Sequence, residues 1–113
     1  MYVTITSLKL RSVFGFFKLS WFGFKISQQA KAEKGFIAIK NTGFGLFHYT
    51  LTLWQSEADL KRFAHSSFHL EAMKSSALLA TEIQTYTYAS ATMPNWATAK
   101  KLLLEKGKRL QFK

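Results

Sequence analysis

The sequence has no cysteine, a single proline and only 6 acidic residues among its 113 residues. Without cysteine, the chain cannot form a disulfide, use a thiol nucleophile, hold an iron–sulfur cluster or bind zinc through sulfur. This absence fits a reducing compartment, and we predict a cytoplasmic location. The proline, Pro94, falls just after the last predicted strand and stops it.

Long apolar runs are missing too. No stretch approaches the roughly 20 residues that a membrane-spanning helix needs, and the N-terminus lacks the cleavage pattern of a signal peptide. The 16 Lys and Arg residues give a formal net charge of +10. Such a charge raises the hypotheses of nucleic acid and anionic membranes as partners. Because the basic residues are spread along the chain and come with no nucleic-acid-binding motif, we expect a basic surface and no nucleic-acid partner.

The rest of the chain is organised around residues 47–73. Apolar and polar residues alternate from Phe47 to Trp54, which predicts a β-strand. Ser56 is a good helix N-cap and Asp59 follows three residues later, so a helix should begin there, with Phe63 toward the sheet. A second helical run is predicted from Ser67. The half-polar face of the strand carries threonine instead of charge, so we expect a partner chain to cover it.

The remaining elements complete an α+β pattern. We predict strands at 2–9, 36–40 and 82–91, a helix from 11 to about 33 that ends before Gly35, a turn at 41–45, a terminal helix at 96–106 and a loose basic tail at 107–113. The order βαββαβ on one antiparallel sheet is the ferredoxin-like arrangement, here with a C-terminal helix and within one domain, 1–113. Two such sheets packed face to face form a dimeric α+β barrel. We therefore predict a homodimer in which the twin subunit hides threonines and tyrosines, while the apolar sheet face holds the helices.

The segment 11–27 is the most aromatic part of the chain. A single face of its predicted helix carries Phe14, Phe17, Trp21 and Phe24. The simplest interpretation is a helix packed on the sheet, with some side chains in a dimer interface. Two alternatives remain open, namely the wall of a pocket for an apolar ligand and a peripheral membrane contact that uses Lys18 and Lys25.

Several features of the sequence between Ser12 and His69 resemble a known family. The features are Gly43 and Gly45 before a strand, a strand that ends in Trp54, an acidic-capped helix with Phe63, and His69 further along. With the aromatic segment Ser12 to Phe24, they are similar to the dimeric α+β-barrel superfamily of antibiotic-biosynthesis-monooxygenase-like proteins, and most closely to its spheroidene-monooxygenase-like branch. The resemblance covers most of residues 1–92. It implies the fold above, and a range from haem-dependent and cofactor-free oxygenases to proteins without known activity, so the fold does not fix the function.

The candidate site residues surround the second helix. His65 and His69 are spaced i, i+4, but a zinc site needs three or four ligands, so we predict no metal site. His69 is the candidate catalytic residue, as an acid/base group or, partly from the resemblance, as a haem ligand; the alternative is a structural imidazole bonded to backbone. The predicted ligand pocket is lined by Phe14, Phe17, Trp21, Trp54, Phe63, His65 and Tyr86. Trp54 itself is expected to be a packing anchor.

These observations lead to one hypothesis and one alternative. The first is a monooxygenase-like oxidoreductase that acts on a hydrophobic small molecule in an apolar pocket between the sheet and the helices, with haem as the cofactor that the resemblance makes conceivable. The alternative is a non-enzymatic module of the same fold that binds a hydrophobic ligand or serves as a dimeric scaffold.

Overall fold

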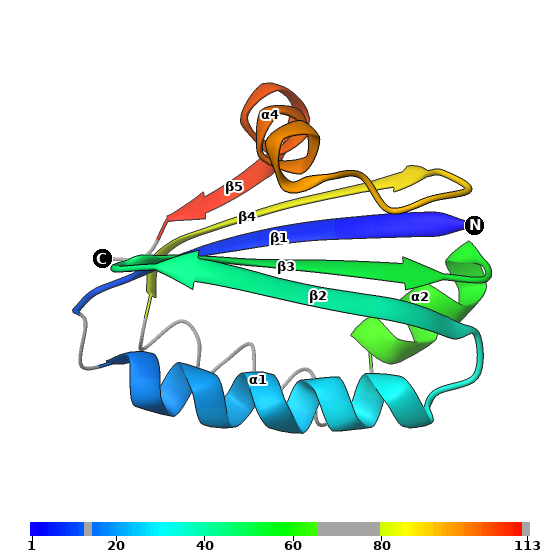
Figure 1. Cartoon of the computed structure of the whole chain (residues 1–113), viewed down its shortest axis with the longest axis horizontal. Coiled ribbons are helices and arrows are strands. Elements are labelled where there is room, and N and C mark those ends of the chain that lie inside the picture. Colours follow the sequence, from blue (N-terminus) through cyan, green and yellow to red (C-terminus); the bar gives the residue numbers. More distant parts are fainter. Residues whose placement is uncertain (13–14, 66–79, 112–113) are drawn as a thin grey trace.

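The computed structural model of the chain describes residues 1–12, 15–65 and 80–111 (Figure 1). Its elements are β1 (Tyr2–Leu10), α1 (Gly15–Ala32), β2 (Phe36–Phe44), β3 (Phe47–Trp54), α2 (Glu57–Ala64), β4 (Ala80–Ala89), α4 (Trp96–Lys106) and β5 (Lys108–Gln111). The predicted βαββαβ order with a C-terminal helix is confirmed. The second helical run predicted from Ser67 lies outside the described residues.

The five strands form one antiparallel sheet in the order β2-β3-β1-β4-β5. β1 is the central strand, and it pairs with β3 on one side and with β4 on the other. Thr4 in β1 lies opposite Thr52 in β3 and Thr87 in β4, so that threonines form a row across three strands. This topology confirms the predicted α+β, ferredoxin-like fold.

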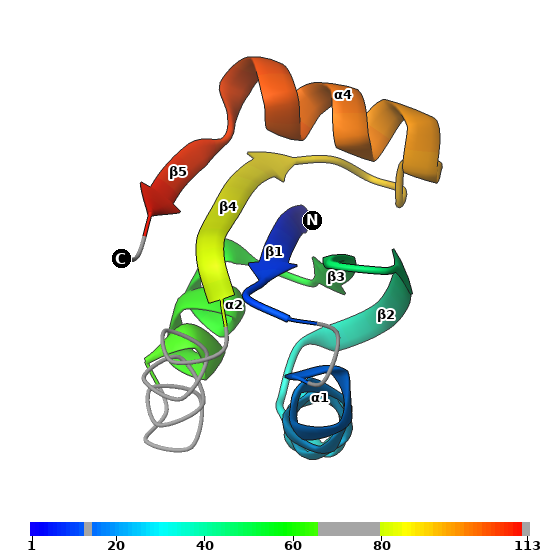
Figure 2. The same ribbon diagram turned by 90° about the vertical axis from the view of Figure 1, so that its left-hand side faces the viewer.

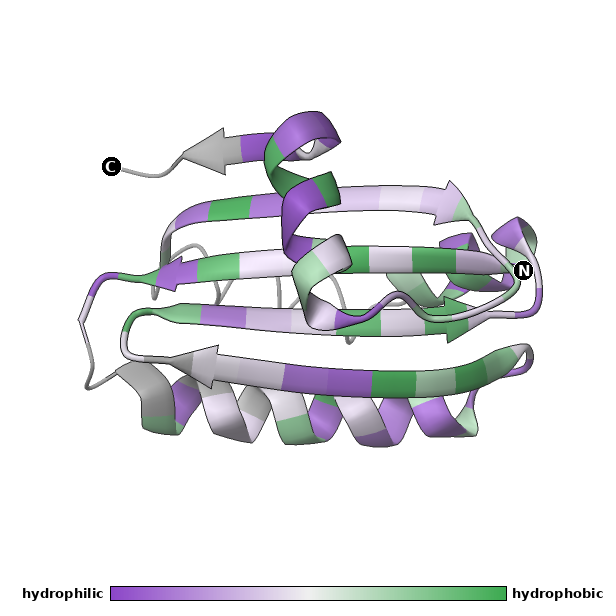
Figure 3. Cartoon of the chain, turned by 45° about the horizontal axis from the view of Figure 1, so that its top comes forward, coloured by the Kyte–Doolittle hydropathy of each residue, from purple (hydrophilic) through white to green (hydrophobic). Residues whose placement is uncertain are grey.

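Helices cover both faces of the sheet (Figure 2). Because side chains alternate along a strand, each face has its own residues. The threonine face, with Thr4, Thr6, Thr50, Thr52, Thr85 and Thr87, also carries Trp54, which packs against α1 and α2 through Ala30 and Phe63. The aliphatic face is formed by Val3, Ile5, Leu51 and Leu53, and these pack against Ala99 and Leu103 of α4. Figure 3 shows α4 crossing in front of the sheet, with hydrophobic bands along the strands behind it.

The predicted assignment of the two faces is therefore wrong. We expected the aliphatic face to hold the helices after β1 and β3, and the threonines and tyrosines to share the other face. Instead, α1 and α2 lie on the side of the threonines, whereas Tyr49, Tyr86 and Tyr88 lie on the aliphatic face beside α4. The aliphatic face is also not bare, because α4 of the same chain covers part of it.

Two further expectations need correction. Residues 108–111 are not a loose tail but form β5, which pairs with β4 between Glu82–Gln111 and Thr85–Lys108. The loop predicted at 41–45 is shorter, because β2 runs on to Phe44 and pairs with β3 along its whole length. The turn between the two strands is formed by Gly45 and Leu46. The φ of Gly45 is 62°, which glycine adopts without strain.

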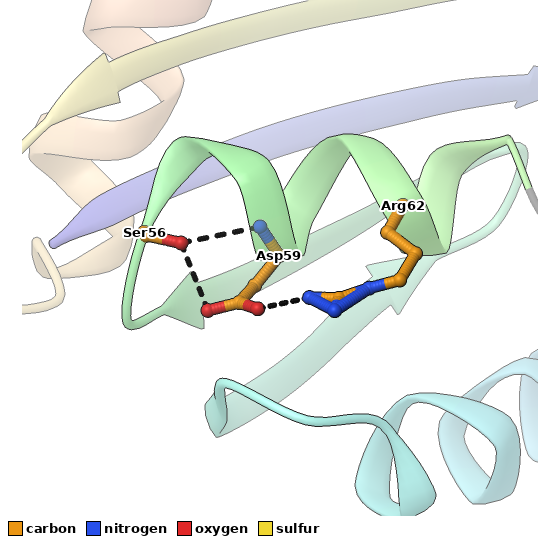
Figure 4. A network of polar contacts seen from close by, with 3 residues as sticks. All are labelled: Ser56, Asp59 and Arg62. Atoms are coloured by element: carbon orange, nitrogen blue, oxygen red, sulfur yellow. Dashed lines mark hydrogen bonds and ion pairs between the residues drawn. The ribbon is translucent and has the colours of Figure 1, made fainter.

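The predicted cap of α2 is confirmed and fixes this helix against the start of β2 (Figure 4). The Ser56 hydroxyl accepts from the Asp59 amide at 3.2 Å and donates to the Asp59 carboxylate at 2.8 Å, and Arg62 pairs with the second carboxylate oxygen. The Ser56 hydroxyl and then Arg62 hold the pKa of Asp59 below its ordinary value. Asp59 also packs on Gly35, where φ is 86° and any side chain would overlap the carboxylate. The Gln55 amide donates to the Gly35 carbonyl at 2.7 Å, so α2 is held at that turn.

The position of α4 can be tested with two neighbouring leucines. Leu103 is buried against the aliphatic face, whereas Leu104 is 70% exposed. We expect Leu103→Ala to lower the free energy of unfolding of the single chain by about 2–4 kcal/mol, the usual cost of a cavity in a core, and Leu104→Ala to change that of the single chain by less than about 0.5 kcal/mol. Urea denaturation followed by circular dichroism measures both. Equal effects of the two substitutions would show that α4 does not pack as described.

Candidate functional site

An aromatic cluster lies between the threonine face and the helices α1 and α2. Its buried members are Trp54 at the end of β3, Phe63 of α2 and Ala30 of α1. The Trp54 ring centroid is 5.1 Å from that of Phe63 and 5.8 Å from that of Phe36, the latter in an edge-to-face arrangement. Ile26 of α1 and Leu60 of α2 close the cluster. Trp54 and Phe63, both predicted to belong to one site, are therefore brought together, and the packing role expected of Trp54 is confirmed.

One polar atom in this cluster is unusual. The indole Nε1–H of Trp54 is buried and has no hydrogen-bond acceptor among the described residues. A buried donor without a partner costs about 1–3 kcal/mol, which is why nearly all buried N–H groups have one. The other described members of the cluster are apolar or aromatic side chains, and this N–H is a donor that could pair with a carbonyl or hydroxyl oxygen.

Phe17 and Trp21, predicted to form the pocket wall on α1, do not face the sheet. Phe17 is 77% exposed and Trp21 is 58% exposed, because both lie on the side of α1 that points away from the sheet. They do not line a space between α1 and the sheet. His65 follows α2 as its C-cap, with its amide donating to the Lys61 carbonyl at 3.0 Å, and its side chain is exposed. It is therefore not placed in the apolar cluster either.

The other predicted residues are not joined to this cluster. Tyr86 lies on the opposite, aliphatic face, where it stacks on Tyr88 with ring centroids 5.4 Å apart. Burial is the main cause that raises the pKa of Tyr88 above its ordinary value, and the neighbouring Tyr86 raises it further. Phe14 and His69 lie outside the described residues. The position of His69, which carried the catalytic hypothesis, thus stays a prediction.

A hollow that no sequence pattern indicated opens on the aliphatic face past the end of α4. It has a volume of about 220 Å³ and is lined by Ser7, Lys9, Phe47, Tyr49, Glu82, Gln84, Leu104 and Arg109. Arg109 of β5 pairs with Glu82 of β4 at 2.7 Å, and the Lys9 ammonium lies 5.5 Å from the centre of the Phe47 ring. Lys9 and Glu82 lie opposite each other in the pairing of β1 with β4, and Arg109 joins them because β5 pairs with β4. No pattern in the sequence indicated β5.

The described residues do not fit a metal or haem site. No group of three or more His, Asp or Glu side chains comes together among residues 1–12, 15–65 and 80–111. The cluster around Trp54 consists of apolar and aromatic side chains, and the described histidine nearest in sequence, His65, is exposed at a helix end. The hypothesis of a haem site depends on His69, which lies outside the described residues.

Neither a protein-family model nor a curated protein matches the sequence. Solved structures, in contrast, are similar to it. A candidate antibiotic biosynthesis monooxygenase from Deinococcus radiodurans is 14% identical and has a TM-score of 0.75, over 84% of this chain and 97% of that chain. Another candidate of the same kind, from Nitrosomonas europaea, is 14% identical with a TM-score of 0.71, over 81% of this chain and 100% of the other.

A third similar structure is SnoaB, a cofactor-independent oxygenase from Streptomyces nogalater. It is 7% identical, with a TM-score of 0.70 over 83% of this chain and 96% of SnoaB. At such low identities, the likeness shows the fold alone. The fold is that of antibiotic biosynthesis monooxygenase proteins, which confirms the predicted resemblance at this level. The narrower spheroidene-monooxygenase-like branch stays a prediction.

The unpaired N–H of Trp54 gives a stability prediction. Trp54→Phe removes the donor but keeps one aromatic ring. The free energy gained by removing an unpaired buried N–H should offset most of the free energy lost with the packing of the larger ring. We expect the free energy of unfolding to change by less than about 1 kcal/mol, against a loss of about 3–5 kcal/mol for Trp54→Ala. Chemical denaturation measures both, with Trp96→Phe as the control at a half-buried tryptophan. A loss above about 3 kcal/mol for Trp54→Phe would mean that the N–H has a partner in the folded protein.

Proposed function

We propose that the protein is a monooxygenase-like enzyme that acts on a hydrophobic small molecule. The observation that supports this most is the buried Trp54 N–H in an apolar cluster between the sheet and α1 and α2. Sites for small molecules combine apolar walls with a few polar groups that fix the orientation of the ligand. An oxygen-bearing hydrophobic molecule is the ligand for which a single N–H donor is suited. The fold shared with a cofactor-independent oxygenase adds to the support.

A reaction without a cofactor sets a requirement on the substrate. Oxidation of a CH₂ group to a carbonyl by O₂ yields one water, and the substrate supplies all the electrons. Trp54 would donate a hydrogen bond to the substrate oxygen and hold it as charge develops there. Haem is the alternative source of oxygen chemistry. It depends on His69, and we derive no step through it. The finer placement in the spheroidene-monooxygenase-like branch, and a single domain across 1–113, belong to the same proposal.

Oxygen uptake tests the enzyme proposal. We expect the protein to consume O₂ with at least one compound from a panel of hydrophobic, oxygen-bearing aromatics, without added cofactor. Trp54→Phe should lower kcat/KM at least about tenfold, the effect of losing one hydrogen bond of about 1.4 kcal/mol, while Trp96→Phe should not. An oxygen electrode and the product mass measure this.

The remaining outcomes separate the alternatives. Saturable binding of the same compounds without O₂ uptake would favour a non-enzymatic ligand-binding module. If the protein neither binds these compounds nor takes up O₂ with them, the scaffold alternative is favoured. Activity unchanged in Trp54→Phe would remove Trp54 from the site.

We also propose that the chain is a homodimer that associates through its aliphatic face. α4 leaves one end of this face open, and there Phe47 and Leu104 are exposed beside the charged hollow. Exposed apolar side chains next to charged ones are typical of protein interfaces. The pairing thus differs from the bare sheet face that the sequence predicted, because α4 would take part in it.

The dimer has its own test. Light scattering should give a mass of two chains for the wild-type protein and of one chain for Phe47→Gln/Leu104→Gln. The matched control is Trp21→Gln/Phe24→Gln, which removes two exposed apolar side chains from the other side of the molecule and should leave the dimer intact. A wild-type mass of one chain would contradict the proposal.

A further inference from the structure

The outer side of α1 presents three large aromatic side chains to the surroundings. Phe17, Trp21 and Phe24 are 77%, 58% and 56% exposed. With 3.6 residues per turn, they lie within an arc of about 60° on the helix. Ile26 and Ala30, which contact the cluster around Trp54, lie on the opposite side. We call these three residues the aromatic face of α1; Figure 2 views the helix along its axis, at the bottom of the molecule.

Trp21 and Phe24 are exposed and are not part of the contact of α1 with the core around Trp54. The sheet side of α1 already provides its contact with the core, so the helix does not need the aromatic face for stability. Helices that are apolar on all sides are normally buried, and contiguous exposed apolar side chains mark contact sites. None of the described helices is long and apolar enough to cross a membrane. A partner of this outward-facing stripe would be a surface that lies alongside the helix.

The charges of α1 indicate which surface this is. The helix sequence GFFKLSWFGFKISQQAKA contains three lysines and no acidic residue. By the helical repeat, Lys18 and Lys25 flank the aromatic face on one side and Lys31 on the other. The Lys25 ammonium lies 4.9 Å from the centre of the Trp21 ring, so the cation is held beside the indole. A second copy of this helix would bring like charges together, which disfavours self-pairing, whereas an anionic surface is complementary.

We infer that the aromatic face of α1 docks on an anionic lipid surface, with α1 parallel to the membrane plane. Tryptophan and phenylalanine favour the boundary between headgroups and acyl chains, and lysines beside them reach the anionic headgroups. Trp21 and Phe24 insert, and Lys18 and Lys25 contact the headgroups. The inference does not depend on the proposed enzyme activity, since it uses the side of α1 that faces away from Trp54.

Vesicle co-sedimentation tests this inference with the whole chain. The probe is a phosphatidylcholine vesicle in which about a third of the lipid is phosphatidylglycerol, compared with pure phosphatidylcholine. We expect partitioning to the anionic vesicles that weakens between about 0.1 M and 1 M salt, where the screening length falls from about 10 Å to about 3 Å. Lys18→Gln/Lys25→Gln should weaken partitioning about twenty-five-fold, since each lysine near such a surface contributes about fivefold. Trp21→Gln/Phe24→Gln should abolish it.

A matched variant on the other side of the sheet controls for charge. Lys101→Gln/Lys106→Gln removes the same charge from exposed positions of α4. This variant should bind vesicles like the wild type. Glutamine keeps the helix propensity, and circular dichroism verifies the fold of each variant. Trp21→Phe should keep most of the vesicle binding of the wild type, because an aromatic ring remains at that position.

Several results would overturn the inference. One is no binding to anionic vesicles at about 0.1 M salt. Another is an equal loss of binding in the α4 lysine variant, which would mean that net charge alone is responsible. A solution mass that falls in Trp21→Gln/Phe24→Gln, with no vesicle binding by the wild type, would assign the face to a second copy of the chain. Displacement of the protein from vesicles by a single-stranded oligonucleotide would assign it to nucleic acid.

Discussion

The register of β1 between β3 and β4 decides how the rest of the molecule is assembled. Val3 and Ile5 meet Leu53 and Leu51 on one neighbouring strand and the two tyrosines of β4 on the other, and the threonines then fall on the opposite face. A slip by one residue would exchange the two faces of the strand. Burial of Val3 and Ile5 under α4 therefore fixes the register and, with it, the side on which Trp54 meets α1 and α2.

This arrangement gives the chain two separate cores instead of one. The first, under α4, is aliphatic and lies on the same side of the sheet as the charged hollow. The second, around Trp54, is aromatic and contains a buried N–H without an acceptor among the described residues. Both cores contribute to stability, and the proposed function is assigned to the second. Substitutions at Leu103 act on the first core, whereas the proposed chemistry depends on the second.

The local elements could be predicted from the sequence because their signals are short-range. Ser56 with Asp59 begins α2, and Asn95 accepts from the Thr98 amide at 2.8 Å to begin α4, both as their residue types indicate. β5 could not be predicted, because KRLQ has no alternating pattern and becomes a strand only through pairing with residues about 25 positions earlier. The face assignment failed for a similar reason. A period of two defines two faces but not which helix covers each, and a stripe such as Phe17 and Trp21 looks alike whether it points inward or outward.

The two edges of the sheet differ in what they offer to another chain. β5 shields the backbone of β4, so that in the sheet as described the long outermost strand is β2. Its start is irregular between Phe36 and Ala38, and its middle carries the exposed Lys40 and Asn41. A lysine and a bulge on an edge strand disfavour pairing with a strand of another chain. They therefore protect against edge-to-edge aggregation of sheets. Association of this protein is thereby directed to its broad sides, where side chains and not backbone amides choose the partner.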